Sequence, residues 1–324
     1  MSVLTRKLAV YLVTAWVAIT VNFLLPRLMP GNPVQLMIGK IQGRVTPAVQ
    51  HAIELQFGVG LHQSLWAQYG RYWAQLFHGN LGESITLSAP VATVLAAKIP
   101  WTLVLFGTST VISFALGTAA GIVLGWRRSG WLDSLLPVST FFQAVPYFFL
   151  GLVLLLVFGV DLHWFPPQGN YQQGLTPGPN WAFIASVIRY AELPGITIVL
   201  SSVAGWMLGM RNMMITTMDE DFVLVARAKG LPARRVISYA ARNAILPSIA
   251  SFSLAVGLVV SGALLVELVF NYPGVGNLLL QAVLEEDYPL LQGIFLVITF
   301  TVLAANLLAD FIYVFLDPRV RQEA

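Results

Sequence analysis

Few side chains in this sequence could take part in chemistry. Glu267, Asn306 and Asp310 lie in or beside long apolar stretches, where a polar or charged side chain is costly and usually has a function. Glu267 could line the mouth of a pathway through the protein or cap the neighbouring Pro273–Gly274 turn. Asn306 and Asp310 share a helix face, although Asp310 is close enough to a helix end to be simply solvated. These groups are too few and too far apart for a membrane-embedded enzyme.

Neither a metal site nor a nucleotide site is predicted on this chain. The histidines have no ligand-like spacing, and the acidic runs 219–221 and 285–287 lack the spacing of a calcium loop. The pair Gly39–Lys40 lacks the preceding glycine and the following serine or threonine of a phosphate-binding loop. The absence of cysteine excludes disulfides and thiolate metal sites. We therefore expect no cofactor on this chain.

The most informative polar segment is 211–242, which separates two apolar runs. The acidic triplet 219–221 favours a helix start, because negative charge is stabilised at a helix N-terminus. A helix of about two turns is predicted over Phe222–Lys229. Gly230 is a typical residue for a left-handed helix end, and a proline follows two residues later. A second helix is predicted over Ala233–Asn243.

The first of these helices would expose Phe222, Val223, Leu224 and Val225 at a membrane surface. One interpretation is an interfacial helix that rests on anionic lipid, with its basic end reaching the headgroups. The other is a docking element whose apolar side chains fill a groove on a cytosolic partner. The residues alone leave both open.

The rest of the chain is strongly apolar. Hydrophobic residues make up 57% of the 324 positions and charged residues 10%, whereas about a quarter of a soluble domain is charged. Such a chain cannot cover its surface with polar groups, so lipid must be one of its solvents. Since a span needs about 20 mostly apolar residues, we predict an all-α polytopic bundle of about six transmembrane helices. The apolar windows are Leu8–Pro26, Ile99–Trp126, Ser134–Val160, Leu193–Met210, Asn243–Glu267 and Tyr288–Ala309.

A further charge-free stretch, Leu268–Leu284, contains a Pro-Gly turn and is predicted as an outside loop or a partial re-entrant segment. With the N-terminus inside, most of the 18 basic residues lie in cytoplasmic segments, so both termini are predicted to be cytoplasmic. The first apolar run is long enough to span and lacks a small-residue cleavage site, which favours a retained helix over a signal peptide. The expected parts are residues 1–29 (tail and first helix), 30–98 (an extracytoplasmic loop region) and 99–324 (a core domain with five transmembrane helices and the cytoplasmic loop).

Several motifs resemble one family of membrane proteins. Ala226–Gly230, with Leu246-Pro247 after it, resembles the EAA-type coupling loop of ABC importer permeases, although Ala226 replaces the glutamate. Over nearly the whole chain, the order and spacing of motifs resemble the B-type dipeptide and oligopeptide permease subunit. Tyr239 is a departure, since that branch often has histidine there. The motifs are 27–33, 79–84, 266–276, 287–289 and 316–321.

The resemblance implies a type I ABC importer permease fold in the bacterial inner membrane. The chain would form half of the translocation pathway for dipeptides or oligopeptides. The implied partners are a homologous second permease, an extracytoplasmic substrate-binding protein, the lipid bilayer and two cytosolic subunits that bind ATP and Mg; nucleic acid is not among them. The implied ATPase-coupling residues are Asp221, Phe222, Val223, Ala226, Arg227, Ala228, Lys229, Gly230, Arg242 and Asn243.

Two alternatives stay open at this point. The same machinery could import oligosaccharides, nickel chelates or glutathione, as relatives of the resembled branch do, because an importer's selectivity resides largely in its binding protein. A secondary transporter without an ATPase is more remote. It would call for inverted repeats or for ionisable groups at mid-membrane, and the predicted spans contain almost none.

Overall fold

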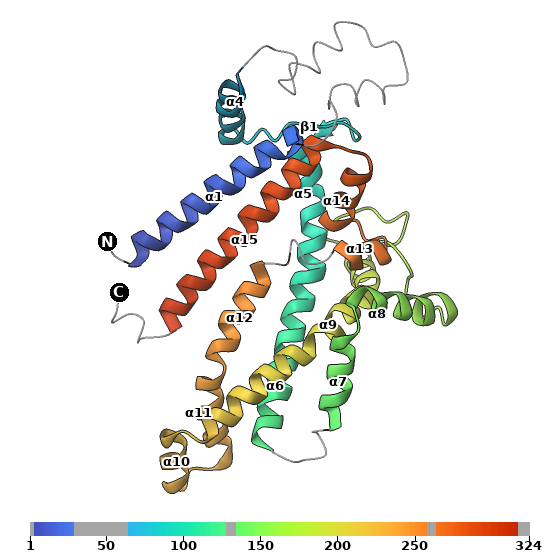
Figure 1. Cartoon of the computed structure of the whole chain (residues 1–324). Helices are drawn as coiled ribbons and strands as arrows, with labels where there is room; N and C mark the ends of the chain where they lie inside the picture. Colours follow the sequence, from blue (N-terminus) through green and yellow to red (C-terminus); the bar gives the residue numbers. More distant parts are fainter. Residues whose placement is uncertain (1–2, 29–63, 128–133, 258, 260–263, 317–324) are drawn as a thin grey trace, which may run out of the picture. The chain divides into compact units, whose positions relative to one another are not determined.

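The computed structural model describes residues 3–28, 64–127, 134–257, 259 and 264–316 (Figure 1). Within these residues the chain is almost entirely helical, as predicted. Two short strands, β1 (Glu83–Ser84) and β2 (Ala89–Pro90), pair in antiparallel fashion with Glu83 opposite Pro90. The helices are α1 (Val3–Leu28), α4 (Leu65–Phe77), α5 (Val91–Thr102), α6 (Thr108–Trp126), α7 (Leu135–Ala144), α8 (Tyr147–Leu154), α9 (Trp181–Met218), α10 (Asp221–Ala228), α11 (Ala233–Ala244), α12 (Leu246–Gly257), α13 (Leu264–Val269), α14 (Val275–Leu284) and α15 (Tyr288–Leu316), with π-helical turns η1 (Leu103–Gly107) and η3 (Leu155–Asp161).

Among the described residues, 4 helices are long and apolar enough to cross a membrane. They lie at Leu8–Leu25, Val91–Trp126, Trp181–Met218 and Tyr288–Leu308. A fifth span results if the pair α7 and α8–η3, which is bent by 100° at Val145–Pro146, is counted as one. The predicted helical membrane bundle is confirmed. The window Asn243–Glu267 corresponds to α12 and α13, and residues 258 and 260–263 between them lie outside the described part.

Two spans are longer than their apolar windows. The second predicted span begins at Val91 instead of Ile99. The fourth predicted span, Leu193–Met210, is only part of α9, which runs over 38 residues from Trp181 to Met218. Charged residues near a helix end do not stop the helix: Arg189 and Glu192, one turn apart in α9, form an exposed ion pair of 3.4 Å. At 1.5 Å per residue, α9 is roughly 57 Å long, about twice the thickness of the hydrocarbon core.

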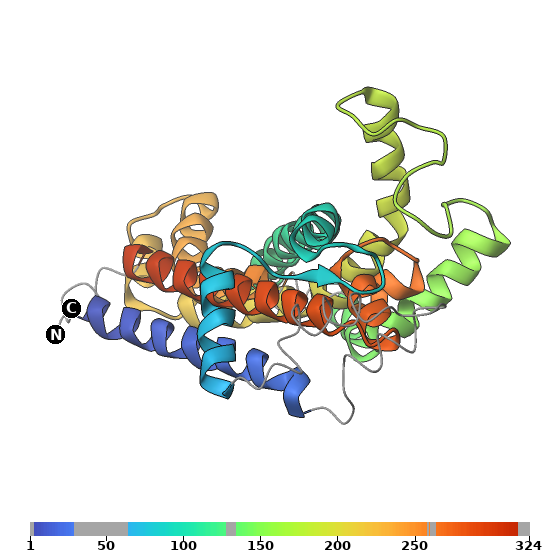
Figure 2. The same ribbon diagram turned by 90° about the horizontal axis from the view of Figure 1, so that it is seen from above.

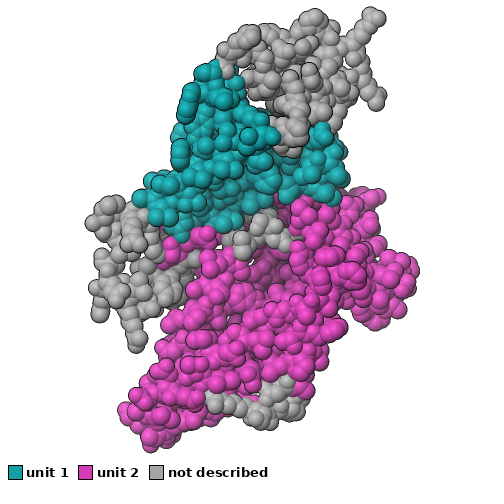
Figure 3. Space-filling view, in the orientation of Figure 1, with its two compact units in different colours: residues 1–99, 278–303 teal, residues 100–277, 304–324 magenta. Residues whose placement is uncertain are grey.

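The chain divides into two compact units, coloured separately in Figure 3. Unit 1 comprises residues 1–99 and 278–303, and unit 2 comprises residues 100–277 and 304–324. Unit 2 holds the predicted coupling loop and all three predicted pathway residues.

The helices α6 and α9 pack closely against each other in unit 2. Gly117, Gly121 and Gly125 recur one turn apart on the α6 face toward α9 and are buried. A Cβ at Gly121 would lie 2.6 Å from the Met207 carbonyl oxygen, and one at Gly125 would lie 2.5 Å from the Met214 Cβ. Small residues let membrane helices approach this closely, so that packing forces act along the whole contact.

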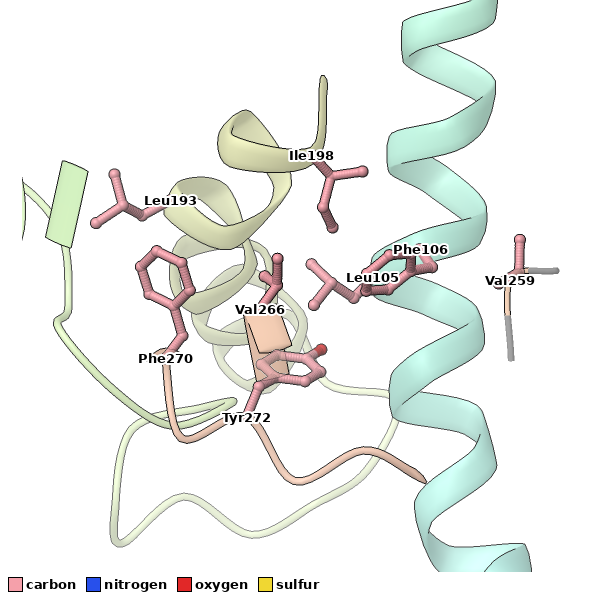
Figure 4. Packing of buried hydrophobic residues seen from close by; sticks show 8 residues of the cluster. All are labelled: Leu105, Phe106, Leu193, Ile198, Val259, Val266, Phe270 and Tyr272. Atoms are coloured by element: carbon pink, nitrogen blue, oxygen red, sulfur yellow. The ribbon is translucent and has the colours of Figure 1, made fainter. Parts of the chain in front are cut away.

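A second packed region of unit 2 surrounds the turn after α13 (Figure 4). Side chains from the helix around η1, from α9 and from α13 converge there on two aromatic residues of that turn. The cluster joins segments that are far apart in the sequence and fixes the turn against the helices. Its members are Leu105, Phe106, Leu193, Ile198, Val259, Val266, Phe270 and Tyr272.

In unit 1, a buried carboxylate joins the β1–β2 hairpin to the start of α15. Asp287 has no exposed surface. Its Oδ2 accepts hydrogen bonds from Ser84 Oγ (2.6 Å) and from the Thr86 amide (3.0 Å). Its Oδ1 accepts one from the Leu290 amide (3.1 Å), in the first turn of α15. Asp287 is therefore the N-cap of α15, which explains why the Asn-Leu-Gly-Glu-Ser and Asp-Tyr-Pro motifs occur together.

Candidate functional site

The segment 211–242 folds into the two short helices that the sequence predicts, with their ends within one residue of the predicted ones. α10 begins at Asp221, whose charge lies in the positive first turn. Gly230 adopts a left-handed φ of +71°. Hydrogen bonds from the Gly230 amide to Arg227 O (2.9 Å) and from the Leu231 amide to Ala226 O (3.3 Å) close the helix end. Pro232 then precedes the first turn of α11.

One face of α10 is buried in unit 2. Val223 is fully buried and Ala226 is 5% exposed. The prediction that all four residues 222–225 are exposed is therefore wrong for Val223. Positions three apart lie on one helix face, and this face packs into an apolar cluster formed with the end of α9 and with α11. The cluster contains Met210, Met214, Met218, Val223, Ala226, Val236, Ala240 and Ala244.

The remaining apolar side chains of α10 are open to solvent. Phe222, Leu224 and Val225 are 41%, 50% and 51% exposed. The other predicted coupling residues of this helix and of the turn that follows it, Asp221, Arg227, Ala228, Lys229 and Gly230, are exposed as well. α10 thus has a face held by the membrane helices and a face free for contact.

Arg227 joins α10 to the end of α6. The Arg227 guanidinium lies 5.7 Å from the centre of the Trp126 ring at the end of α6, within cation–π range. Arg242 and Asn243 are exposed in the last turn of α11, where the side-chain amide of Asn243 donates to Tyr239 O (3.0 Å). The structure therefore brings the α10 residues together with the ends of α6 and α9, while Arg242 and Asn243 lie at the far end of α11.

Glu267 is fully buried, and its carboxylate holds the turn that precedes α14. Oε1 accepts a hydrogen bond from Thr102 Oγ1 (2.6 Å), and Oε2 accepts from the amides of Gly276 (2.7 Å) and Asn277 (3.0 Å). These amides belong to the first turn of α14, where a negative charge is favoured. The sequence left open whether Glu267 lines the mouth of a pathway or caps the Pro273–Gly274 turn. These hydrogen bonds are the ones expected of a cap.

The glycines of this turn leave room for the carboxylate. A Cβ at Gly274 would lie 2.0 Å from Glu267 Oε1, and one at Gly276 would lie 2.5 Å from the Leu264 Cα. The conjunction of glutamate, Pro-Gly and a second glycine in 266–276 is therefore one structural unit. Sequence reasoning missed Thr102, whose hydroxyl also accepts from the Val275 amide (2.8 Å), because a threonine in an apolar run gives no such signal.

The turn also carries Tyr272, a fully buried aromatic residue. Its ring lies edge-on to Trp101 with ring centres 6.2 Å apart, and its amide donates to Glu267 O (2.7 Å). Burial, together with the nearby charge of Glu267, raises the pKa of the Tyr272 hydroxyl above its ordinary value.

Asn306 and Asp310 lie on α15, and both are half-buried. They belong to the part of α15 in unit 2. The pathway role of these residues stays a prediction.

Residues 117–322 match the family described as "Binding-protein-dependent transport system inner membrane component". The chain belongs to this family. The match spans α10 and α11, the Glu267 turn and α15. The permease is thus an inner-membrane component of a transport system, and the resemblance in its coupling loop is part of a family-wide match.

Curated relatives cover the permease almost from end to end. It is 33% identical over 341 residues to a di/tripeptide transport system permease protein of Pseudomonas aeruginosa (100% of this chain, 99% of the relative). It is 35% identical over 307 residues to a putative peptide permease protein of Brucella suis (92% of each). It is also 31% identical over 325 residues to a probable D,D-dipeptide transport system permease protein of Escherichia coli (95% and 94%).

Proposed function

We propose that this permease forms half of the translocation pathway of an ATP-driven peptide importer, with both termini in the cytoplasm. A homologous second permease supplies the other half, and an extracytoplasmic binding protein delivers dipeptides or oligopeptides. The peptide assignment is supported by three relatives named as peptide, di/tripeptide or D,D-dipeptide permeases. Their similarity extends over at least 92% of this chain.

The observation that carries the proposal is the two-sided packing of α10. Phe222, Leu224 and Val225 enter a groove on a cytosolic ATPase subunit, while Val223 and Ala226 hold the same helix against the ends of α9 and α11. A docked helix in a groove needs such an apolar face. When the ATPase moves α10, the buried face passes the displacement to the membrane helices.

Energy coupling requires that the ATPase states bind α10 unequally, since equal affinity would transmit nothing. Two ATPase subunits, one on each permease, hold ATP and Mg, and their closure switches the pathway between inward- and outward-facing states. The α6–α9 contact makes α9 a stiff element between α10 and the opposite membrane face. Asn306 and Asp310 are the candidate pathway residues of this scheme, with Glu267 fixing the turn before α14.

The whole assignment is tested by reconstituting the permease with its partner subunits in proteoliposomes that contain ATP. Uptake of a labelled dipeptide is expected only when the ATPase subunits and the binding protein are present. Peptide uptake by the permease in the absence of any ATPase would contradict the importer mechanism. ATP-dependent uptake of a sugar or a nickel chelate, with no peptide uptake, would contradict the cargo alone.

Replacing Leu224 by aspartate is expected to weaken ATPase binding at least about tenfold, because burying a leucine contributes about 1.5–3 kcal/mol. The measurement is the affinity of the purified ATPase for the permease in nanodiscs. Val223→Ala is the matched control one residue away. It creates a cavity in the buried cluster and should lower permease stability by about 2 kcal/mol. Equal ATPase affinity of Leu224→Asp and the unmodified permease would refute docking through this face.

Gly230→Trp is expected to separate ATP hydrolysis from uptake, because a left-handed φ is unfavourable for a bulky residue and shifts the end of α10. No neighbouring atom lies within 4 Å of a Cβ at this position, so the cost comes from the backbone and not from a clash. Gly230→Asn is the control, since asparagine tolerates this conformation. Uptake per ATP should fall several-fold only for the tryptophan variant. If assembly and uptake survive in it unchanged, the coupling role of this turn is wrong.

A further inference from the structure

The helix α4 has a continuous aromatic and apolar side. In an α-helix, Trp66, Gly70, Trp73 and Phe77 fall on one stripe. Trp66 and Phe77 are 82% and 81% exposed, although they are among the largest apolar side chains. The polar residues Gln68, Arg71, Gln75 and His78 occupy the other side of the helix. α4 is thus an amphipathic helix whose aromatic stripe is largely open.

A second flank of α4 is fixed to α1. Tyr69 Oη lies 2.7 Å from Thr20 Oγ1, and the Tyr69 ring packs edge-on against Phe23 at 5.1 Å. Tyr72 Oη accepts a hydrogen bond of 3.2 Å from the side-chain amide nitrogen Nδ2 of Asn22, which also donates to Gln292 O of α15 (2.9 Å). All of these residues belong to unit 1. α4 is therefore fixed to α1, and α1 is in turn hydrogen-bonded to α15.

These contacts also fix the depth of α4 along α1. The apolar window of α1 ends at Leu25, and the contacts with α4 lie between Thr20 and Arg27, where Arg27 donates to Gln68 Oε1 (3.0 Å). At 1.5 Å per residue, this interval runs from roughly 8 Å inside the window's end to roughly 3 Å beyond it. The contacts therefore straddle the end of the apolar window of α1, the level at which interfacial helices meet the headgroups.

α4 crosses α1 instead of running alongside it, as Figure 2 shows for the light-blue helix over the blue one. A helix that crosses a membrane span near its end has the arrangement expected of an interfacial helix. Next to this contact, Val21, Leu24 and Leu25 are 53%, 38% and 38% exposed on α1. Tryptophan is the side chain enriched at this level of a membrane.

From this geometry we propose that α4 is an interfacial anchor that buries Trp66, Trp73 and Phe77 among the phospholipids at the membrane face where α1 ends. The occupant is lipid and not a protein, because α4 is fixed where the apolar window of α1 ends and its most exposed side chains, Trp66 and Phe77, are of the type that interfacial helices bury. The anchor fixes the height and orientation of the segment that enters the membrane after α4. It does not depend on which cargo the permease carries.

Site-directed fluorescence tests the anchor, and the chain's lack of cysteine allows one probe per variant. The full-length variants Trp66→Cys, Phe77→Cys and Gln75→Cys are labelled with bimane and reconstituted in vesicles of phosphatidylethanolamine and phosphatidylglycerol. Nitroxides on the lipid headgroup or on the upper acyl chain should quench positions 66 and 77 at least about twofold more than position 75. Iodide in the buffer should quench in the reverse order.

Two results would overturn the proposal. Strong iodide quenching at positions 66 and 77 would place the stripe in water. Weak quenching by both reagents would place it against protein. Two independent aromatic positions are probed, so a variant that fails to fold still leaves the other to decide. The control at Gln75 is exposed on the polar side of the same helix.

Discussion

Replacing Gly121 by leucine should destabilise the permease more than a substitution at an open glycine. A Cβ at this position would already lie 2.6 Å from the Met207 carbonyl oxygen and 2.7 Å from the Met210 Cβ. Backbone atoms cannot rotate away, so α6 and α9 must separate along their whole contact. We expect the free energy of unfolding to fall by about 3 kcal/mol or more. The temperature at which the detergent-solubilised permease aggregates should fall by about 5–10 °C.

Gly209→Leu provides the matched control in the same helix pair. Gly209 lies in α9, and a Cβ there would meet no atom within 4 Å. Both variants add the same side chain, and both gain helix propensity, so only the close approach differs. Gly121→Ala should fall between Gly121→Leu and the unmodified permease. If Gly121→Leu and Gly209→Leu melt together, the close α6–α9 contact is not a source of stability.

Replacing Glu267 by alanine should detach the turn before α14. The Thr102 hydroxyl and the amides of Gly276 and Asn277 would lose their acceptor while they stay buried. Each buried donor without a partner costs about 1–3 kcal/mol, so we expect a loss of about 3–5 kcal/mol. The predicted result is a fall in the level of folded permease and rapid hydrogen exchange of the amides at 275–277, measured by mass spectrometry.

Thr102 separates the hydrogen-bond network from simple packing. Thr102→Val keeps the shape but removes the hydroxyl that donates to Glu267 and accepts from the Val275 amide. It should lose about 2 kcal/mol. Thr102→Ser keeps the hydroxyl and should be close to the unmodified permease in exchange at 275–277. Equal protection in the valine and serine variants would show that the hydroxyl is not what holds this turn.

Local signals predicted the helices α10 and α11 well. The ends of α10 depend on Asp221 and Gly230, which act within one turn of the chain, so they could be inferred from residue type and order. Sequence reasoning failed for Val223, one of four consecutive apolar residues. Which of them is buried depends on α9 and α11, which no local pattern places.

Contacts between residues far apart in the chain could not be predicted from the sequence either. Glu267 left two roles open because its choice depends on Thr102, 165 residues away. The apolar windows located the spans but not their ends, since hydropathy does not register a helix that continues through Lys98 or Arg189. The depth at which α4 meets α1 is set by Tyr69 and Tyr72, whose partners lie 49 and 50 residues earlier.

The Asp287 cap has a consequence for the order of biosynthesis. Ser84 leaves the ribosome 203 residues before its carboxylate partner. At about 5–20 residues per second, roughly 10–40 s pass in which the β1–β2 hairpin has no acceptor for Ser84 Oγ. During this time α5, α6 and α9 are synthesised and can enter the membrane. Unit 1 can therefore close only after most of unit 2 has been made, and the hairpin stays open to chaperones or proteases until α15 emerges.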